Sequence, residues 1–219
     1  MKNRKNHRTL FAGIAAILTF LLWTAAVSLI DVRAIGPRGS SVGFAALNGW
    51  VHDLTGVHMG LYTVTDWLGL VPLGIMFGFG VLGFVQLVKR RSLRRVDASI
   101  LILGAYYFIL MAIYLFFESV VINYRPVLID GFLEASYPSS TTLLVLGVMP
   151  TAVMQLKGRM KNQQLWKTVA VVFMAFTVFM VIGRFISGVH WFTDIIASLI
   201  LSAGLVMLYD GAVGCVEKV

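Results

Sequence analysis

Residues 98–117 read Ala-Ser-Ile-Leu-Ile-Leu-Gly-Ala-Tyr-Tyr-Phe-Ile-Leu-Met-Ala-Ile-Tyr-Leu-Phe-Phe and contain no charged side chain. About 20 consecutive apolar residues are enough to cross the hydrocarbon core of a bilayer as one helix. A helix also satisfies its own backbone hydrogen bonds where no water is present. The stretch therefore predicts a transmembrane helix and, with it, a membrane protein.

Other apolar runs extend this interpretation to the whole chain. They cover residues 9–30, 67–88, 141–156, 168–183 and 191–209, and the last run contains a single charge, Asp194, near its start. The chain is 58% hydrophobic and 13% charged, whereas ordinary soluble domains carry about 25% charged residues. We expect an all-α polytopic membrane protein with six transmembrane helices. We expect one membrane domain over residues 1–219, with the motif-bearing core at 98–210.

The basic residues are unevenly distributed along the chain. All but four of the 18 Lys and Arg residues precede the first run, separate the second from the third or the fourth from the fifth, or end the chain: Lys2, Arg4, Lys5, Arg8, Lys89, Arg90, Arg91, Arg94, Arg95, Lys157, Arg159, Lys161, Lys167 and Lys218. The positive-inside rule makes that side cytoplasmic. This topology accounts for the net charge of +8 without a nucleic-acid partner. We expect an integral protein of a bacterial plasma membrane with both termini in the cytoplasm.

The remaining basic residues, Arg33, Arg38, Arg125 and Arg184, fall on the outer side. Arg184 lies six residues before His190, and Asp194 follows His190 by four residues. Residues four apart share one helical face, so the carboxylate can reach the imidazole and hold one tautomer. Such a pair is also found as a buried polar contact that only stabilises a fold. An arginine on the same side, whose guanidinium suits a phosphate, favours an anion site.

A second group of residues lies at other span ends on the same side. Arg125 brings a further guanidinium, and Pro138 starts a new helix for which Ser139 is a suitable N-cap. Backbone amides and hydroxyls at a helix N-terminus bind phosphate oxygens. We therefore expect Ser139, Ser140 and Thr141 to bind phosphate.

Together these residues meet the needs of phosphoryl transfer, which are cations and amides around the phosphate oxygens and a nucleophile in line with the leaving group. Arg125 and Arg184 supply the charge. His190, oriented by Asp194, can attack phosphorus as a neutral imidazole. No further ligands accompany the His–Asp pair at the spacing of a metal site, so we expect neither a metal nor another cofactor.

On these motifs the chain resembles the type 2 phosphatidic acid phosphatase family of membrane lipid phosphatases. The family pattern has three blocks: Lys, six residues and Arg-Pro; then Pro-Ser-Gly-His; then Ser-Arg, five residues, His, three residues and Asp. The matching residues are Arg125-Pro126, Pro138-Ser139 and, at the family spacing, Arg184, His190 and Asp194, with Gly183 in place of the serine. The resemblance implies a six-helix fold with an outward-facing phosphate site and His190 as the nucleophile.

Two positions depart from the family pattern. Glu118 stands in place of the lysine, and Thr141 replaces the histidine that serves the family as general acid. General acid catalysis is typically worth about 10²–10⁴-fold in rate, so the proton donor has to be replaced or dispensed with. Glu118, His52 and His58 are the candidate donors. Glu118 could equally form a structural ion pair with Arg125.

The departures leave two functions open. In the first, the protein is a hydrolase that cleaves a lipid phosphate or diphosphate at the outer membrane face through a phospho-histidine intermediate. In the second, it binds, carries or regulates a lipid phosphate without cleaving it. In both, the expected partners are a lipid phosphate and the surrounding membrane lipids, whose headgroup and chain length the motifs do not specify.

Overall fold

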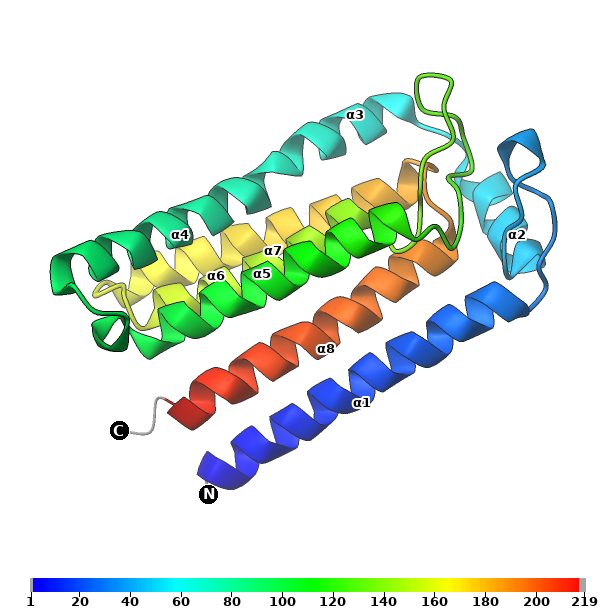
Figure 1. Ribbon diagram of the computed structural model, residues 1–219. Helices are drawn as coiled ribbons and strands as arrows, with labels where there is room; N and C mark the ends of the chain where they lie inside the picture. The colour runs from blue at the N-terminus through cyan, green and yellow to red at the C-terminus, as the bar shows by residue number, and fades with distance from the viewer. Residues whose placement is uncertain (1, 217–219) are drawn as a thin grey trace.

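The computed structural model describes residues 2–216 of the chain, and within them it is helical with no named strand. The helices are α1 (Lys2–Leu29), α2 (Ala45–Thr55), α3 (Met59–Leu68), α4 (Leu70–Arg90), α5 (Ala98–Ser119), α6 (Ser140–Lys157), α7 (Gln163–Ile186) and α8 (Phe192–Val216), with 3₁₀ turns at Pro37–Gly39 and Leu93–Arg95. The long helices run side by side as one bundle (Figure 1). Lys218, one of the basic residues considered above, lies outside the described part.

Five helical segments of the described chain are long and apolar enough to cross a membrane, whereas the sequence predicts six spans. The five are Asn6–Leu29, Met59–Arg90, Ala98–Ser119, Gln163–Ile186 and Phe192–Val216. The predicted fourth span corresponds to α6, which contacts α4, α5, α7 and α8. It buries Thr142, Thr151 and Gln155 against these helices, so its polar residues face protein. Four of the five candidate spans therefore pack against α6, which is a more polar helix.

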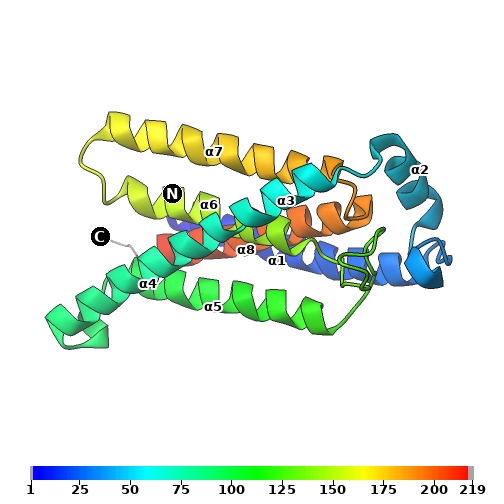
Figure 2. The same ribbon diagram turned by 90° about the horizontal axis from the view of Figure 1, so that it is seen from above.

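The second span is longer than the predicted run of residues 67–88. α3 and α4 follow each other with only Gly69 between them, and together they form the candidate span Met59–Arg90. The early part of this span lies before the apolar run of residues 67–88. Residues 59–68 contain both apolar and polar side chains, and the helix that they form packs on α7. α3 thereby reaches the end of the bundle at which the predicted site residues lie (Figure 2).

α1 and α8 lie side by side over their whole length (Figure 1). Their backbones approach closely because glycines face each other: a Cβ atom on Gly204 would lie 3.2 Å from the carbonyl oxygen of Gly13. Small residues at helix contacts are typical of membrane bundles, where packing rather than hydrophobicity holds helices together. This pair connects the first span to the helix that carries Asp194.

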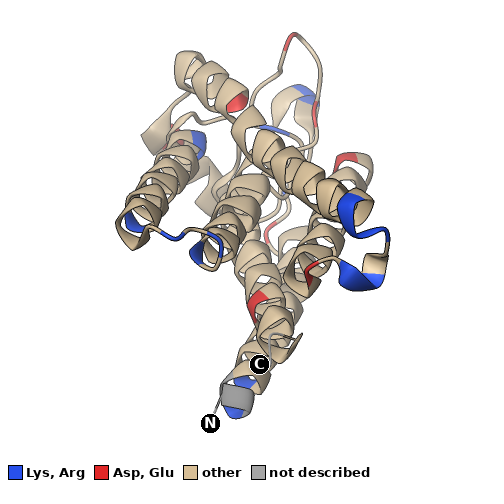
Figure 3. Cartoon of the chain, turned by 90° about the vertical axis from the view of Figure 1, so that its left-hand side faces the viewer, with Lys and Arg blue, Asp and Glu red and all other residues tan. Residues whose placement is uncertain are grey.

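The charged residues divide the bundle into two unlike ends. Lys and Arg gather in the loops that join α4 to α5 and α6 to α7, at the end where α1 begins and α8 ends (Figure 3). The opposite end carries α2 and the loop of residues 120–139, which has isolated bridges at Tyr124–Ala135 and Ile129–Phe132. The basic loops and the predicted site residues thus lie at opposite ends.

Candidate active site

A cavity of about 520 Å³ lies at the end of the bundle opposite the basic loops. Five helices and the 120–139 loop contribute to its wall. The lining residues are Tyr62, Asp66, Gly69, Leu70, Leu73, Tyr114, Glu118, Arg125, Glu134, Ala135, Ser140, Thr141, Leu144 and Arg184. Residues of the first, second and third motif blocks thus meet at one place, although about 60 residues of chain separate Arg125 from Arg184.

His190 contacts Arg125 and lies in the short loop between α7 and α8. It is 4% exposed. Its Nδ1 is 3.1 Å from the backbone carbonyl oxygen of Ser136. A carbonyl oxygen only accepts hydrogen bonds, so Nδ1 carries the proton and Nε2 bears the lone pair. Nε2 lies 3.4 Å from Nη1 of Arg125, which donates to it. The unprotonated nitrogen of a neutral imidazole therefore faces the arginine.

The loop that carries His190 is fixed by a close approach to the α2–α3 connection. Gly188 has φ +68°, and a Cβ atom there would lie 1.8 Å from the carbonyl oxygen of Gly56. The amide of His58 donates to the carbonyl of Ser187 at 2.9 Å. Because only glycine combines this φ with such a short approach, the sequence Ser187-Gly188 sets the position of His190.

Asp194 is fully buried at the start of α8, close to His190 as the spacing of four residues predicts. Its Oδ2 is 3.8 Å from Nδ1 of His190, too long for a hydrogen bond. The carboxylate instead accepts from the amide of Trp191 at 2.9 Å, from the hydroxyl of Ser136, and from the side-chain amide of Asn123 at 3.4 Å. Asp194 therefore orients the imidazole mainly through Ser136, which contacts both groups.

Burial, followed by the positive charges of Arg125 and Arg184, lowers the pKa of His190 well below its usual value of 6.5. All three causes disfavour the imidazolium. Because the folded pKa lies below the unfolded one, this group contributes stability above about pH 6.5, and the contribution is lost as the pH falls through the folded pKa. The imidazole is thus neutral at physiological pH.

We expect ¹⁵N NMR of histidine-labelled protein to show His190 neutral, with Nδ1 protonated, from about pH 8 to below about pH 6, since its pKa lies below the usual value of 6.5. The denatured protein serves as the reference, in which histidine titrates near pH 6.5. The His190→Gln protein identifies the resonance. A His190 signal that titrates in the folded protein as it does in the denatured one would contradict this expectation.

The two arginines are held around one aromatic ring by separate carboxylates. The guanidinium carbons of Arg125 and Arg184 lie 5.7 Å and 4.9 Å from the ring centre of Tyr62. Arg125 Nε is 3.0 Å from Glu134 Oε2, and Arg184 Nη2 is 3.4 Å from Asp66 Oδ1. Paired and stacked guanidiniums have little freedom to reorient. Two cations are therefore preorganised at the cavity wall.

The expected helix N-terminus is present, but Ser139, Ser140 and Thr141 differ in their contacts. α6 begins at Ser140, and Ser140 and Thr141 line the cavity. Ser139 occupies the N-cap position and is fully buried. Its amide donates to the carbonyl of Asp194 at 3.3 Å, and its hydroxyl contacts that of Thr142 at 2.9 Å. Ser139 thus joins α6 to α8, whereas Ser140 and Thr141 face the cavity.

Of the three candidate proton donors, Glu118 lines the cavity, and the two histidines lie elsewhere. The ring of His52 packs on that of Trp191, with 5.5 Å between ring centres. Nε2 of His58 is 2.9 Å from the carbonyl oxygen of Thr55. The structure places both histidines on α2 and its connection to α3, outside the cavity wall.

The predicted ion pair between Glu118 and Arg125 is wrong, because Arg125 pairs with Glu134 instead. The bridge between Tyr124 and Ala135 places residues 125 and 134 opposite each other, and the amide of Arg125 also donates to the carbonyl of Glu134 at 3.0 Å. This pairing within one loop places Glu134, rather than Glu118 at the end of α5, within ion-pair distance of Arg125. Glu118 is left without a cation within ion-pair distance among the described residues.

Four contributors to the site were missed in the sequence: Tyr62, Asp66, Glu134 and Ser136. Asp66 gives one signal, because it is a charge directly before an apolar run. Tyr62, Glu134 and Ser136 belong to segments expected to be loops, whose path no periodic pattern describes. Within the described part of the chain, no three His, Cys, Asp or Glu side chains are grouped as a metal site requires.

Comparison with known proteins agrees with the helical membrane fold. The family model described as "PAP2 superfamily" matches residues 117–210. No curated protein matches the chain by sequence. Among solved structures, a transmembrane PAP2-type phosphatidylglycerolphosphate phosphatase from Bacillus subtilis has a similar fold, with a TM-score of 0.52 and 18% identity. The alignment covers 95% of this chain and 98% of that one. The matched segment contains the residues of all three blocks, and the match supports an assignment to the type 2 phosphatidic acid phosphatase (PAP2) family for this integral membrane protein.

Proposed function

We propose that the protein is a lipid phosphatase that hydrolyses a lipid phosphate or diphosphate at the outer face of the membrane, with His190 as the nucleophile. Nε2 attacks phosphorus, and a P–N bond forms as the bond to the lipid oxygen breaks. The leaving oxygen takes a proton. Water then attacks the phospho-histidine, releases phosphate and regenerates the neutral imidazole.

One observation carries this proposal: the lone pair of Nε2 faces Arg125 at 3.4 Å, beside the cavity that Arg184 also lines. A purely structural histidine has no need of an unprotonated nitrogen directed at a cation. Two guanidiniums around one phosphate stabilise the charge that spreads over its oxygens in the transition state. Ser140 and Thr141 add the N-terminus of α6 to that stabilisation.

Glu118 is the group best placed to protonate the leaving oxygen. It lines the cavity with Thr141, the residue that stands where the family carries its general acid. No arginine or lysine among the described residues lies within ion-pair distance of it, and its side chain is exposed at the end of α5. A carboxyl group that is not committed to a cation is free to carry the proton that general acid catalysis requires.

Phosphate release by the purified protein tests the function directly. In detergent or nanodiscs, we expect release from lipid monophosphates and lipid diphosphates without an added metal. Binding of these lipids without release would favour the alternative function, a protein that carries or regulates a lipid phosphate. Absence of both release and binding would exclude both functions.

The orientation of the site follows from the charge asymmetry. The cavity lies at the end opposite the basic loops, which the positive-inside rule assigns to the cytoplasm. In a Cys215→Ser background, we expect Phe132→Cys, which is 69% exposed in the 120–139 loop, to react with an impermeant thiol reagent added to intact cells. Lys161→Cys, in the loop between α6 and α7, serves as the matched control and should react only after lysis. The reverse pattern would place the site inside.

A further inference from the structure

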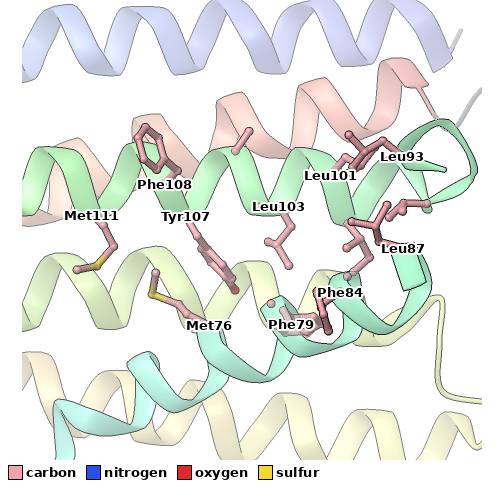
Figure 4. Close-up of a pocket in the computed structure, with 16 residues that line it drawn as sticks. Met76, Phe79, Phe84, Leu87, Leu93, Leu101, Leu103, Tyr107, Phe108 and Met111 are labelled. Atoms are coloured by element: carbon pink, nitrogen blue, oxygen red, sulfur yellow. The ribbon is translucent and has the colours of Figure 1, made fainter. Parts of the chain in front are cut away.

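An apolar groove of about 500 Å³ lies between α4 and α5, nearer the basic end of the bundle than the phosphate cavity. Figure 4 shows its extent: Met76 and Met111 lie at one end, and Leu87 and Leu93 at the other. The groove is separate from the phosphate cavity, but both share α4 and α5 as walls.

On α4 the two hollows lie along one helical face. Leu73 lines the phosphate cavity, and Met76, Gly80, Gly83 and Leu87 line the groove. The steps between these residues are three, four, three and four positions, which is the spacing of neighbours along one stripe of a helix. The stripe therefore leads without a break from the phosphate cavity into the groove.

α5 repeats the pattern in the opposite direction. Tyr114 lines the phosphate cavity, and Met111, Tyr107, Gly104 and Ile100 line the groove at successive steps of three and four positions. Since α5 runs antiparallel to α4, the two stripes face each other along one seam. The headgroup site opens at one end of this seam, and its remaining length is apolar.

Two glycines keep the seam open. A Cβ atom added at Gly80 or at Gly104 would meet nothing within 4 Å. Close helix packing therefore does not require glycine at either position, although glycine inside a helix costs about 0.5–1 kcal/mol relative to alanine. Their effect on the molecule is to leave space on the facing walls of the groove.

The seam is longer than one leaflet is deep. From Leu73 to Leu87 it extends about 21 Å at about 1.5 Å per residue, whereas half of a bilayer core is about 15 Å. We propose that this groove holds one hydrocarbon chain of the lipid phosphate whose headgroup occupies the cavity, and that it selects chains long enough to pass the bilayer midplane. The inference rests on the proposed function, because it assigns the same phosphate site to the headgroup.

Single-chain alkyl phosphates of about 8 to about 20 carbons test the groove, since each methylene that packs against the groove wall adds van der Waals contacts and strengthens binding. Binding to the His190→Ala protein in detergent is measured by calorimetry, so that turnover does not interfere. We expect affinity to rise with chain length until the chain fills about 21 Å of groove. A dependence that levels off at short chains would overturn the proposal.

Gly80→Leu blocks the groove about 10 Å from Leu73, at about 1.5 Å per residue. We expect it to weaken long-chain binding by at least about tenfold, because it closes about half of the groove and the loss of two methylenes alone accounts for about that factor; short-chain binding should be unchanged. Gly78→Leu is the matched control, because Gly78 also has nothing within 4 Å of an added Cβ but lines neither hollow.

Gly104→Leu repeats the block from the opposite wall in case the first variant fails to fold. Equal long-chain binding by Gly80→Leu, Gly104→Leu and Gly78→Leu would show that the surrounding lipid or detergent, not this chain, fills the groove. If alkyl phosphates bind with the expected length dependence but the unmodified protein releases no phosphate, the proposed catalysis fails and the groove assignment stands.

Discussion

Replacing His190 with alanine is expected to lower the rate of phosphate release by about 10⁴-fold or more, as loss of a nucleophile or of its orienting partner does in comparable covalent mechanisms. The residue supplies the only bond that the protein forms to phosphorus in the proposed mechanism. Phosphate release from a lipid phosphate, measured under saturating substrate, gives the rate. The same assay with short incubation and acid-free quenching should trap a phosphorylated protein only when His190 is present.

His190 is buried, so its removal has to be separated from a loss of folding. His190→Gln fills more of the space than alanine and should be equally inactive. Both variants should retain thermal stability near that of the unmodified protein and should still bind a lipid phosphate, because Arg125 and Arg184 remain. His58→Ala, in the connection outside the cavity, is the matched histidine control and should keep full activity. Release that survives either His190 substitution would refute the mechanism.

Replacing Glu118 with glutamine is expected to lower kcat for a lipid monophosphate by about 10²-fold, which is within the usual worth of a general acid. The same substitution should change kcat for the matching lipid diphosphate far less, since phosphate is a better leaving group than an alkoxide and needs less protonation. Comparison of the two substrates with the same lipid chain isolates the proton donor from effects on chain binding.

A histidine at position 141, where the family carries its general acid, should restore the activity lost in Glu118→Gln. In the Glu118→Gln background, Thr141→His should restore monophosphate hydrolysis, because both residues line the same cavity. Glu134→Gln is the matched control: it removes a carboxylate that already pairs with Arg125, so we expect it to alter KM rather than kcat. An unchanged monophosphate kcat in Glu118→Gln would exclude Glu118 as the donor.

The sequence by itself determined the class of the protein and predicted most residues of the candidate site. Hydropathy is a property of each stretch of chain, so the apolar runs could be located without a structure. The third motif block could be read in the same way, because Arg184, His190 and Asp194 lie within eleven residues of one another. α6 shows the limit of this approach, since its polar residues are buried against protein and lower its apolarity below that of a lipid-facing span.

Only the tertiary structure decided the contacts between distant segments. The pairing of Arg125 with Glu134, rather than with Glu118, depends on how the 120–139 loop folds back on itself. The acceptor for Nδ1 of His190 is the backbone carbonyl of Ser136. Every residue has such a carbonyl, so the sequence does not indicate which one accepts this hydrogen bond. The seam between α4 and α5 is formed by residues of two helices that face each other in space. Each depends on relative positions in space, which local hydropathy and spacing do not encode.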